Sequence, residues 1–178
     1  MLRLHSRGFN LIELIIVLAL ISGALAMAAP AMGDWLTKSR QRNLAKAIAH
    51  AITIARTEAI KRNTRVTICI SANQQTCTQS GGWEQGWIIF PGPISSTLEV
   101  DDTIIHHESS GTFFNLTATG NQPVRRYLSF LSTGRPHLLS GAFQAGTITV
   151  CAPGQNAINV VMAATGRTRI ENTSTPCP

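Results

Sequence analysis

Two arginines stand one residue apart near the end of the chain, in the segment Gly166-Arg167-Thr168-Arg169. Gly166 permits a tight turn with a positive φ, because glycine has no Cβ to oppose that conformation. Extended backbone beyond the turn would direct both arginines to one side, about 6.6 Å apart at ~3.3 Å per residue. A planar guanidinium matches a pair of phosphate oxygens better than a lysine ammonium does. The segment therefore predicts a site that binds anions.

The alternative is that these arginines are ordinary surface charge. One of them would then pair with Glu171, or both would be solvated. An exposed pair of that kind contributes only ~0–1 kcal/mol and does not require two arginines. Glu171 is the only acid after residue 124, and the basic residues of the same region are Arg125, Arg126, Arg135, Arg167 and Arg169. This local balance favours a basic patch that binds anions.

No other residues have the spacing of a catalytic or metal site. The chain lacks Gly-x-Ser-x-Gly, a Walker-type phosphate loop and HExxH. Asp101-Asp102 and His106-His107 contain metal-binding residue types, but adjacent residues on a strand point to opposite faces, so these pairs do not converge. We therefore expect no enzymatic activity, no metal site and no cofactor.

Four cysteines, and no Cys-x-x-Cys motif, suggest structural disulfides. They are Cys69, Cys77, Cys151 and Cys177. Four cysteines allow three pairings, and we expect Cys69–Cys77 and Cys151–Cys177 because these bonds close local loops. The second bond would hold the C-terminal tail against the fold. The alternative is four free, buried thiols.

The N-terminus predicts export and a membrane segment. Residues 14–32 carry no charge, and the run from Phe9 to Met32 approaches the ~20 residues that cross a bilayer as a helix. Arg3 and Arg7 should stay in the cytoplasm, which places the rest of the protein on the other side. A secretory signal peptide cleaved after Ala28 is the alternative. Glu13 argues against it, because a carboxylate in an apolar segment is costly and is kept for a function.

The stretch SRGFNLIE, residues 6–13, resembles the type IV prepilin signal. The resemblance implies cleavage between Gly8 and Phe9 by a prepilin peptidase, followed by methylation of the new Phe9 amine. It also implies that Glu13 guides assembly by pairing with the terminal amine of a neighbouring subunit. A buried carboxylate needs such a partner, and an ammonium group supplies one.

The remainder changes from helical to strand periodicity near residue 64. Apolar residues at three- and four-residue steps predict an amphipathic helix over 34–63, continuous with the apolar run and bent near Pro30–Gly33. Its early basic residues are expected to be solvated or to contact lipid head groups; they are Lys38, Arg40, Arg42 and Lys46. Strands are predicted from residue 66 to 70 and at 86–90, 103–107, 127–131, 147–152 and 157–164, with loops at 71–82 and 108–124. The order predicts an α+β fold dominated by antiparallel sheet.

Four segments in this order resemble the GspH/FimT branch of minor pilins and pseudopilins: ARTEAIKRNTRVTIC, GGWEQGWIIF, LSFLSTGRP and GRTR. The resemblance implies a long N-terminal helix, transmembrane in its first half, whose second half packs on a head of antiparallel β-sheets. The expected parts are a leader (1–8), a transmembrane and assembly segment (9–33), an amphipathic helix (34–63) and a β-rich head (64–178). Trp83 and Trp87 are expected in the core of this head, with base stacking as the alternative.

The closing Gly166-Arg167-Thr168-Arg169 is similar to the GRxR motif of FimT-type minor pilins, which bind DNA during natural transformation. Arg135 belongs to the broader family pattern and is the weaker candidate, and Arg125 and Arg126 have only their charge. The resemblance implies DNA, other pilins, the prepilin peptidase and the inner membrane as partners, with the head in the periplasm and then on a pilus. The alternative is a structural minor pilin or a type II secretion pseudopilin that primes filament assembly without binding DNA.

Overall fold

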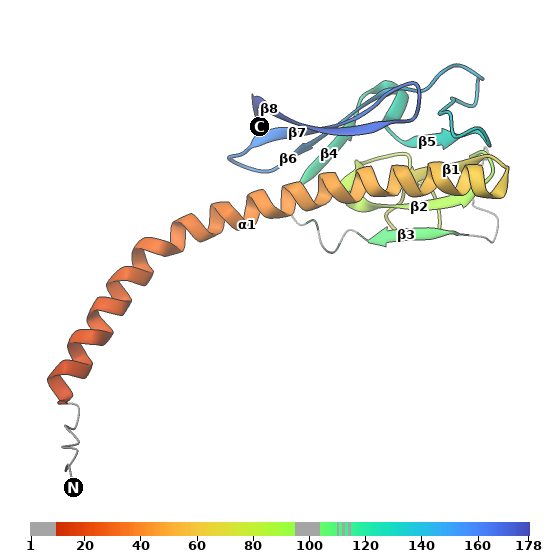
Figure 1. Ribbon diagram of the computed structural model, residues 1–178. Coiled ribbons are helices and arrows are strands. Elements are labelled where there is room, and N and C mark those ends of the chain that lie inside the picture. Colours follow the sequence, from red (N-terminus) through yellow and green to blue (C-terminus); the bar gives the residue numbers. More distant parts are fainter. Residues whose placement is uncertain (1–9, 95–103, 110, 112, 114) are drawn as a thin grey trace, which may run out of the picture. The chain divides into compact units, whose positions relative to one another are not determined.

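Figure 1 shows a computed structural model of the protein, which describes residues 10–94, 104–109, 111, 113 and 115–178, leaving out the side chains of 25–31. Gly8, Phe9 and the pair Asp101-Asp102 lie outside the described residues, so the predictions made for them stay predictions. The chain divides into two compact units, Met1–Thr37 and Lys38–Pro178.

A single helix, α1, runs from Leu11 to Arg62 over 52 residues. It begins after Asn10, whose carbonyl accepts hydrogen bonds from two backbone N–H groups of the first turn. Helical backbone continues through Pro30 and Gly33, so the long helix is confirmed, while the bend expected there stays a prediction. The helix ends before Asn63, which has a φ of 50° and matches the predicted stop.

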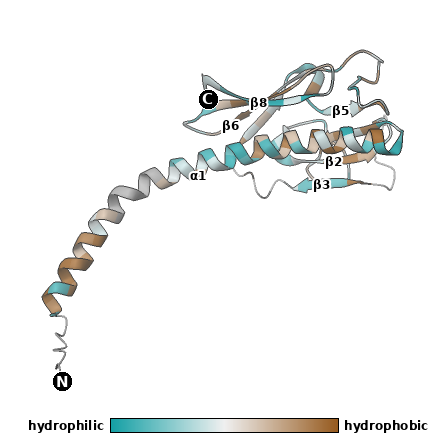
Figure 2. Ribbon diagram, viewed as in Figure 1, coloured by the Kyte–Doolittle hydropathy of each residue, from teal (hydrophilic) through white to brown (hydrophobic). Residues whose placement is uncertain are grey.

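The N-terminal turns of α1 are mostly apolar, as the brown colour in Figure 2 shows. All the large apolar side chains between Leu11 and Ile21 are exposed within this chain. Among the side chains that the structure describes, no helical segment is long and apolar enough to cross a membrane.

The second unit contains two four-stranded antiparallel sheets, which confirms the predicted α+β class (Figure 1). The first sheet has the order β3-β2-β1-β5, formed by His106–Ser109, Gly86–Pro91, Val66–Ile70 and Tyr127–Phe130. The second has the order β4-β6-β7-β8, formed by Thr117–Gly120, Gly146–Cys151, Asn156–Met162 and Thr168–Pro176. Short 3-10 turns, η1 at Trp83–Gln85 and η3 at Gln122–Val124, join some of these strands.

Three strand predictions differ from the structure, and all concern edge strands. The predicted loop 108–124 contains β4, which pairs with β6 and buries Ala118. The strand predicted at 103–107 instead begins at His106 and continues to Ser109 against β2. The nine residues of β8 extend far beyond the short extended segment predicted after Gly166. An edge strand exposes much of its surface, so its sequence lacks the apolar alternation that identifies a central strand.

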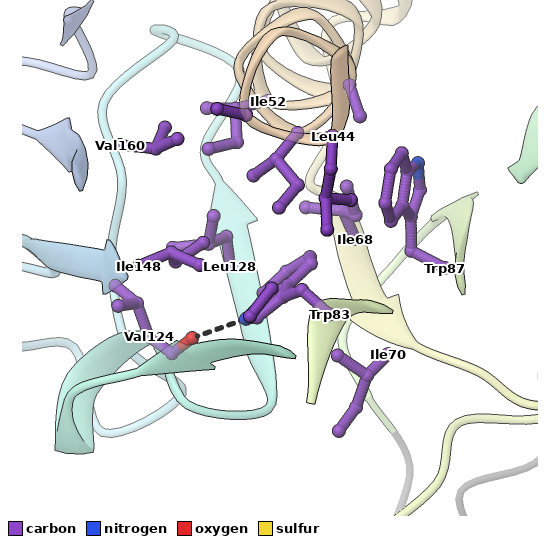
Figure 3. Close-up of a cluster of buried hydrophobic side chains, with 14 of the residues drawn as sticks. Leu44, Ile52, Ile68, Ile70, Trp83, Trp87, Val124, Leu128, Ile148 and Val160 are labelled. Atoms are coloured by element: carbon purple, nitrogen blue, oxygen red, sulfur yellow. Dashed lines mark hydrogen bonds between the residues drawn. The ribbon is translucent and has the colours of Figure 1, made fainter. Parts of the chain in front are cut away.

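The C-terminal half of α1 packs into one hydrophobic core with both sheets (Figure 3). The buried apolar residues of the helix recur at three- and four-residue steps: Leu44, Ala45, Ile48, Ala51, Ile52, Ala55 and Ala59. Trp83 and Trp87 lie in this core with at most 1% of their surface exposed. The Nε1 of Trp83 donates a 3.1 Å hydrogen bond to the carbonyl of Val124. The predicted packing role is confirmed, and neither buried ring is available to stack on a base.

Two disulfides fasten the ends of strands, with the sequential pairing that was predicted. Cys69 in β1 is bonded to Cys77 in the following loop, with Cα atoms 5.6 Å apart. Cys151 at the end of β6 is bonded to Cys177 just after β8, with Cα atoms 5.5 Å apart. The second bond anchors the end of the edge strand β8, so the strand is held at its C-terminus as well as by pairing with β7.

Candidate functional site

Two turns of the head share one construction and the same tripeptide, Thr-Gly-Arg. In the first TGR turn, residues 131–135, the N–H of Leu131 bonds to the carbonyl of Arg135, and the N–H of Gly134 bonds to the carbonyl of Leu131. In the second TGR turn, residues 163–167, Ala163, Gly166 and Arg167 make the equivalent two bonds. The two turns therefore present their arginines from matching backbone positions.

Both turns require glycine at the same position. Gly134 has a φ of 73° and Gly166 a φ of 79°, a conformation that side chains other than glycine rarely adopt. Both glycines are also buried, and a Cβ on Gly166 would lie 2.8 Å from the carbonyl oxygen of Gly134. The two TGR turns are thus in direct contact, although 32 residues separate their glycines in sequence.

Arg56 of α1 lies between the two TGR turns. Its Nη1 donates a 3.3 Å hydrogen bond to the carbonyl of Gly166. Its Nε is buried, has no hydrogen-bond partner, and lies 3.3 Å from the position of a Cβ on Gly134 and 3.4 Å from one on Gly166. The helix therefore contributes a partly buried guanidinium that lies against both turns and bonds to the second one.

Arg135 and Arg167, one from each TGR turn, are exposed. The ion pairs among the described residues include neither of them. The Cζ of Arg135 lies 5.7 Å from the centroid of the Phe143 ring, which leaves its charge unneutralised. The structure therefore brings together two of the predicted arginines on a support of two contacting turns.

Arg169 differs from the expectation that both closing arginines would be free. Its Nε pairs with the carboxylate of Glu171, because side chains two residues apart on β8 point to the same side of the strand. Both side chains are about half exposed, at 60% and 45%, so the pair contributes little to stability. The ion pair with Glu171 that the sequence offered as the alternative is therefore present at Arg169. Arg167 has no acidic partner among the described residues.

Other basic residues near the end of α1 and on the head lie elsewhere or are already paired. Lys61 and Arg62 both contact Glu58, and the hydrogen bond from Arg62 lowers the pKa of that carboxyl. Arg125 and Arg126 line a separate hollow of about 670 Å³. Three basic side chains of α1, near the start of the second unit, are exposed as expected for solvated residues: Lys38, Arg42 and Lys46. Among the described His, Cys, Asp and Glu residues there is no group of three that could hold a metal.

Sequence reasoning identified Arg135 and Arg167 but not the contact between their two turns. It also missed that Arg56 lies against both turns and that Phe143 lies under Arg135. The repeated Thr-Gly-Arg was a usable signal, since two identical turn sequences predict two identical turns. Nothing in the linear pattern distinguishes Arg56 from the other basic residues of α1.

The fold and the comparisons together define the class of the protein. A long N-terminal helix packed on antiparallel sheets is the fold of type IV pilins. The sequence profile of the GspH family, described as type II transport protein GspH, matches residues 44–166, more than half of the chain. The chain belongs to this family, and it is a minor pilin or pseudopilin of the type IV kind.

A solved structure supports the same fold, and a second is reported beside it. The type IV minor pilin FimU of Pseudomonas aeruginosa is 17% identical, with a TM-score of 0.58 over 78% of this chain and 96% of FimU. The minor pseudopilin EpsH from the type 2 secretion system of Vibrio cholerae is 13% identical, with a TM-score of 0.47 over 75% of this chain and 97% of EpsH. No curated protein matches the chain significantly in sequence.

Replacing Gly166 by alanine should destabilise the head more than the same change at Gly154. Both glycines have a positive φ, so each substitution should cost about 1–2 kcal/mol in backbone energy. Only the Cβ at position 166 meets a neighbour, the carbonyl oxygen of Gly134, since the space at Gly154 is open. We expect an additional loss of at least about 1 kcal/mol for Gly166→Ala in urea unfolding followed by circular dichroism. Equal losses would show that the two turns do not press on each other.

Proposed function

We propose that this minor pilin binds DNA without sequence preference during DNA uptake, through Arg135 and Arg167 with Arg169 beside them. The observation that carries the proposal is the contact between the two TGR turns, whose hydrogen-bonded backbone presents two guanidiniums that no acid pairs within the part of the chain that the structure describes. Backbone fixed in this way loses little entropy when the arginines bind, so a larger share of the contact energy appears as affinity.

The proposed binding is electrostatic. Each guanidinium contacts phosphate oxygens and releases condensed counterions, and such contacts position the protein without reading bases. With two to four phosphate contacts, affinity at one site is low and falls steeply with salt. Several copies on one filament, or neighbouring pilins, raise the overall affinity by avidity.

The same proposal includes the route by which the head reaches DNA. The prepilin peptidase cleaves between Gly8 and Phe9, the Phe9 amine is methylated, and Glu13 pairs with a terminal amine of a neighbour. Before assembly the apolar start of α1 anchors the protein in the inner membrane, with the head in the periplasm. FimU, a minor pilin of the same fold, supports a place in a pilus for this chain.

A secreted domain released after Ala28 is the competing route, and the mass of the mature chain separates the two. We expect a chain that begins at methylated Phe9, measured by mass spectrometry on protein isolated from cells. A chain that begins at Ala29 would contradict the anchored pilin.

A structural minor pilin or pseudopilin without DNA contact is the competing function, since the GspH family profile describes a type II transport protein. The two functions differ at the TGR turns. A structural subunit needs the buried glycines and Arg56, whereas only a DNA-binding subunit needs Arg135 and Arg167. Variants of these two exposed arginines therefore separate the functions without disturbing the fold.

Changing Arg135 and Arg167 together to glutamine should weaken duplex binding by at least about tenfold at low salt. Removal of two phosphate contacts should also reduce the slope of log K against log salt by roughly 1.8, at ~0.9 per contact. Both quantities can be measured by fluorescence anisotropy of a labelled duplex, with the full-length chain in a nonionic detergent.

The matched control is Arg125→Gln with Arg126→Gln, which removes the same charge from two exposed arginines beside a separate hollow. If the control pair weakens binding as much as the TGR pair, net charge and not the two turns holds the DNA. In cells, unchanged DNA uptake and normal piliation in the TGR variant would support the structural subunit instead.

Changing Glu171 to glutamine should strengthen duplex binding. The substitution frees Arg169 from its ion pair and removes a negative charge next to the proposed phosphate path. We expect affinity to rise about two- to tenfold at low salt and the salt slope to steepen by up to about 0.9. Glu108→Gln on β3 is the control for net charge. Weaker binding by Glu171→Gln would exclude Arg169 from the interface.

A further inference from the structure

Phe143 is an aromatic ring on the surface, in contact with the first TGR turn's arginine. The side chain is 62% exposed, in contrast to the buried Trp83 and Trp87. The guanidinium of Arg135 lies over the ring, with Cζ 5.7 Å from its centroid, and the ring of His137 lies 5.1 Å away at a tilt of 54°. The ring thus forms one surface with a group that the proposed function assigns to phosphate.

The backbone that carries Phe143 is held firmly. The next residue, Gln144, is fully buried, and its side-chain amide bonds to the backbone of Pro123, Tyr127 and Ser129. The backbone N–H of Gln144 also donates to the carbonyl of Pro136, at 3.1 Å. A ring exposed on such a support is not a loose loop side chain, and its position relative to Arg135 is set by the fold.

The charged and aromatic groups around Phe143 indicate which class of ligand can bind there. The ring has the guanidinium of Arg135 and the imidazole of His137 as neighbours, and the second TGR turn adds Arg167 nearby. The ion pairs among the described residues include neither arginine. An apolar protein partner would have to desolvate these guanidiniums without pairing them, which is costly. A ligand with flat rings and regularly spaced anionic groups satisfies both features, and an unpaired stretch of nucleic acid has both.

We propose that Phe143 is a stacking platform for an unpaired base, so that the site takes single-stranded DNA, or a frayed end, in preference to intact duplex. The base stacks on the open part of the ring while Arg135 and Arg167 hold flanking phosphates. In a duplex the base faces are covered by their neighbours, so the ring has nothing to stack on and only the phosphate contacts remain. This inference rests on the proposed function and adds the form of DNA that the site prefers.

The test compares two single strands with the same number of phosphates. One is a 12-nucleotide oligothymidylate, and the other is a 12-unit abasic strand, which has the same backbone without bases. The full-length chain is held in a nonionic detergent and titrated with each labelled strand and with a 12-base-pair duplex. We expect the base-bearing strand to bind about five- to 150-fold more tightly than the abasic strand, the range expected for stacking one base on an aromatic ring.

Three variants locate the effect. Phe143→Ala should abolish the difference between the two strands and leave duplex affinity unchanged, whereas Phe143→Trp should keep or increase the difference. Leu139→Ala is the matched control, because Leu139 is a 46% exposed apolar residue of the same hairpin and should leave the difference intact. If Phe143→Ala proves unfolded by circular dichroism, the wild type and Phe143→Trp decide the question on their own.

The outcomes separate this inference from the function on which it rests. Equal binding of the base-bearing and abasic strands by the wild type overturns the platform, while salt-sensitive duplex binding leaves the proposed function standing. No binding of any strand or duplex overturns both. Unchanged DNA binding by Phe143→Ala together with a defect in filament assembly would make the ring a contact between subunits, and would also overturn the platform.

Discussion

The candidate site depends on one contact, that between the two glycine turns, which Arg56 of α1 also touches. A Cβ on Gly166 would meet the carbonyl oxygen of Gly134, and a Cβ on Gly134 would meet the side chain of Ile60. Arg56 lies close to both glycines and bonds to the carbonyl of Gly166. The Nε of Arg56 is buried here without a hydrogen-bond partner among the described residues, which costs free energy. Because the two turns have the same backbone, fixing their glycines also fixes where Arg135 and Arg167 leave the surface.

Some arginines of the head are already engaged within the chain. Arg56, Arg62 and Arg169 have partners within the chain, respectively a carbonyl, Glu58 and Glu171. Arg135 and Arg167 have no acid among the ion pairs of the described residues, and neither have the exposed Arg125 and Arg126. Arg135 and Arg167 differ from these in standing on two turns that contact each other. Free guanidiniums on rigid backbone are the groups that bind phosphates with the least loss of entropy. The proposed anion-binding surface therefore needs only the two TGR turns and their arginines.

Much of the fold was predictable where apolar residues recur with the spacing of a helix or a strand. The three- and four-residue spacing from Leu44 to Ala59 predicted the buried face of α1, and alternation predicted β1, since its core residues are apolar. The same reasoning missed β4 and most of β8, because edge strands such as Thr168–Pro176 are polar and mostly exposed. The disulfide pairing was predicted from loop closure and is confirmed.

The candidate site was predictable only in part, because its parts come from distant segments. The sequence indicated Arg167 and Arg169, but the ion pair with Glu171 depends on which side of β8 each residue faces. The contact between Gly134 and Gly166 is a tertiary feature that no local pattern contains. Phe143 was missed because a phenylalanine among apolar and small residues resembles a core residue until its exposure is known.

The most direct measurement of the central claim is a map of backbone amide shifts by NMR as a short duplex is added to the full-length chain in detergent. We predict that the largest shifts occur in both TGR turns, at residues 133–135 and 165–167, and that they diminish together as salt is raised. Shifts centred on the hollow beside Arg125 and Arg126, or shifts in only one of the two turns, would contradict a shared site built on their contact.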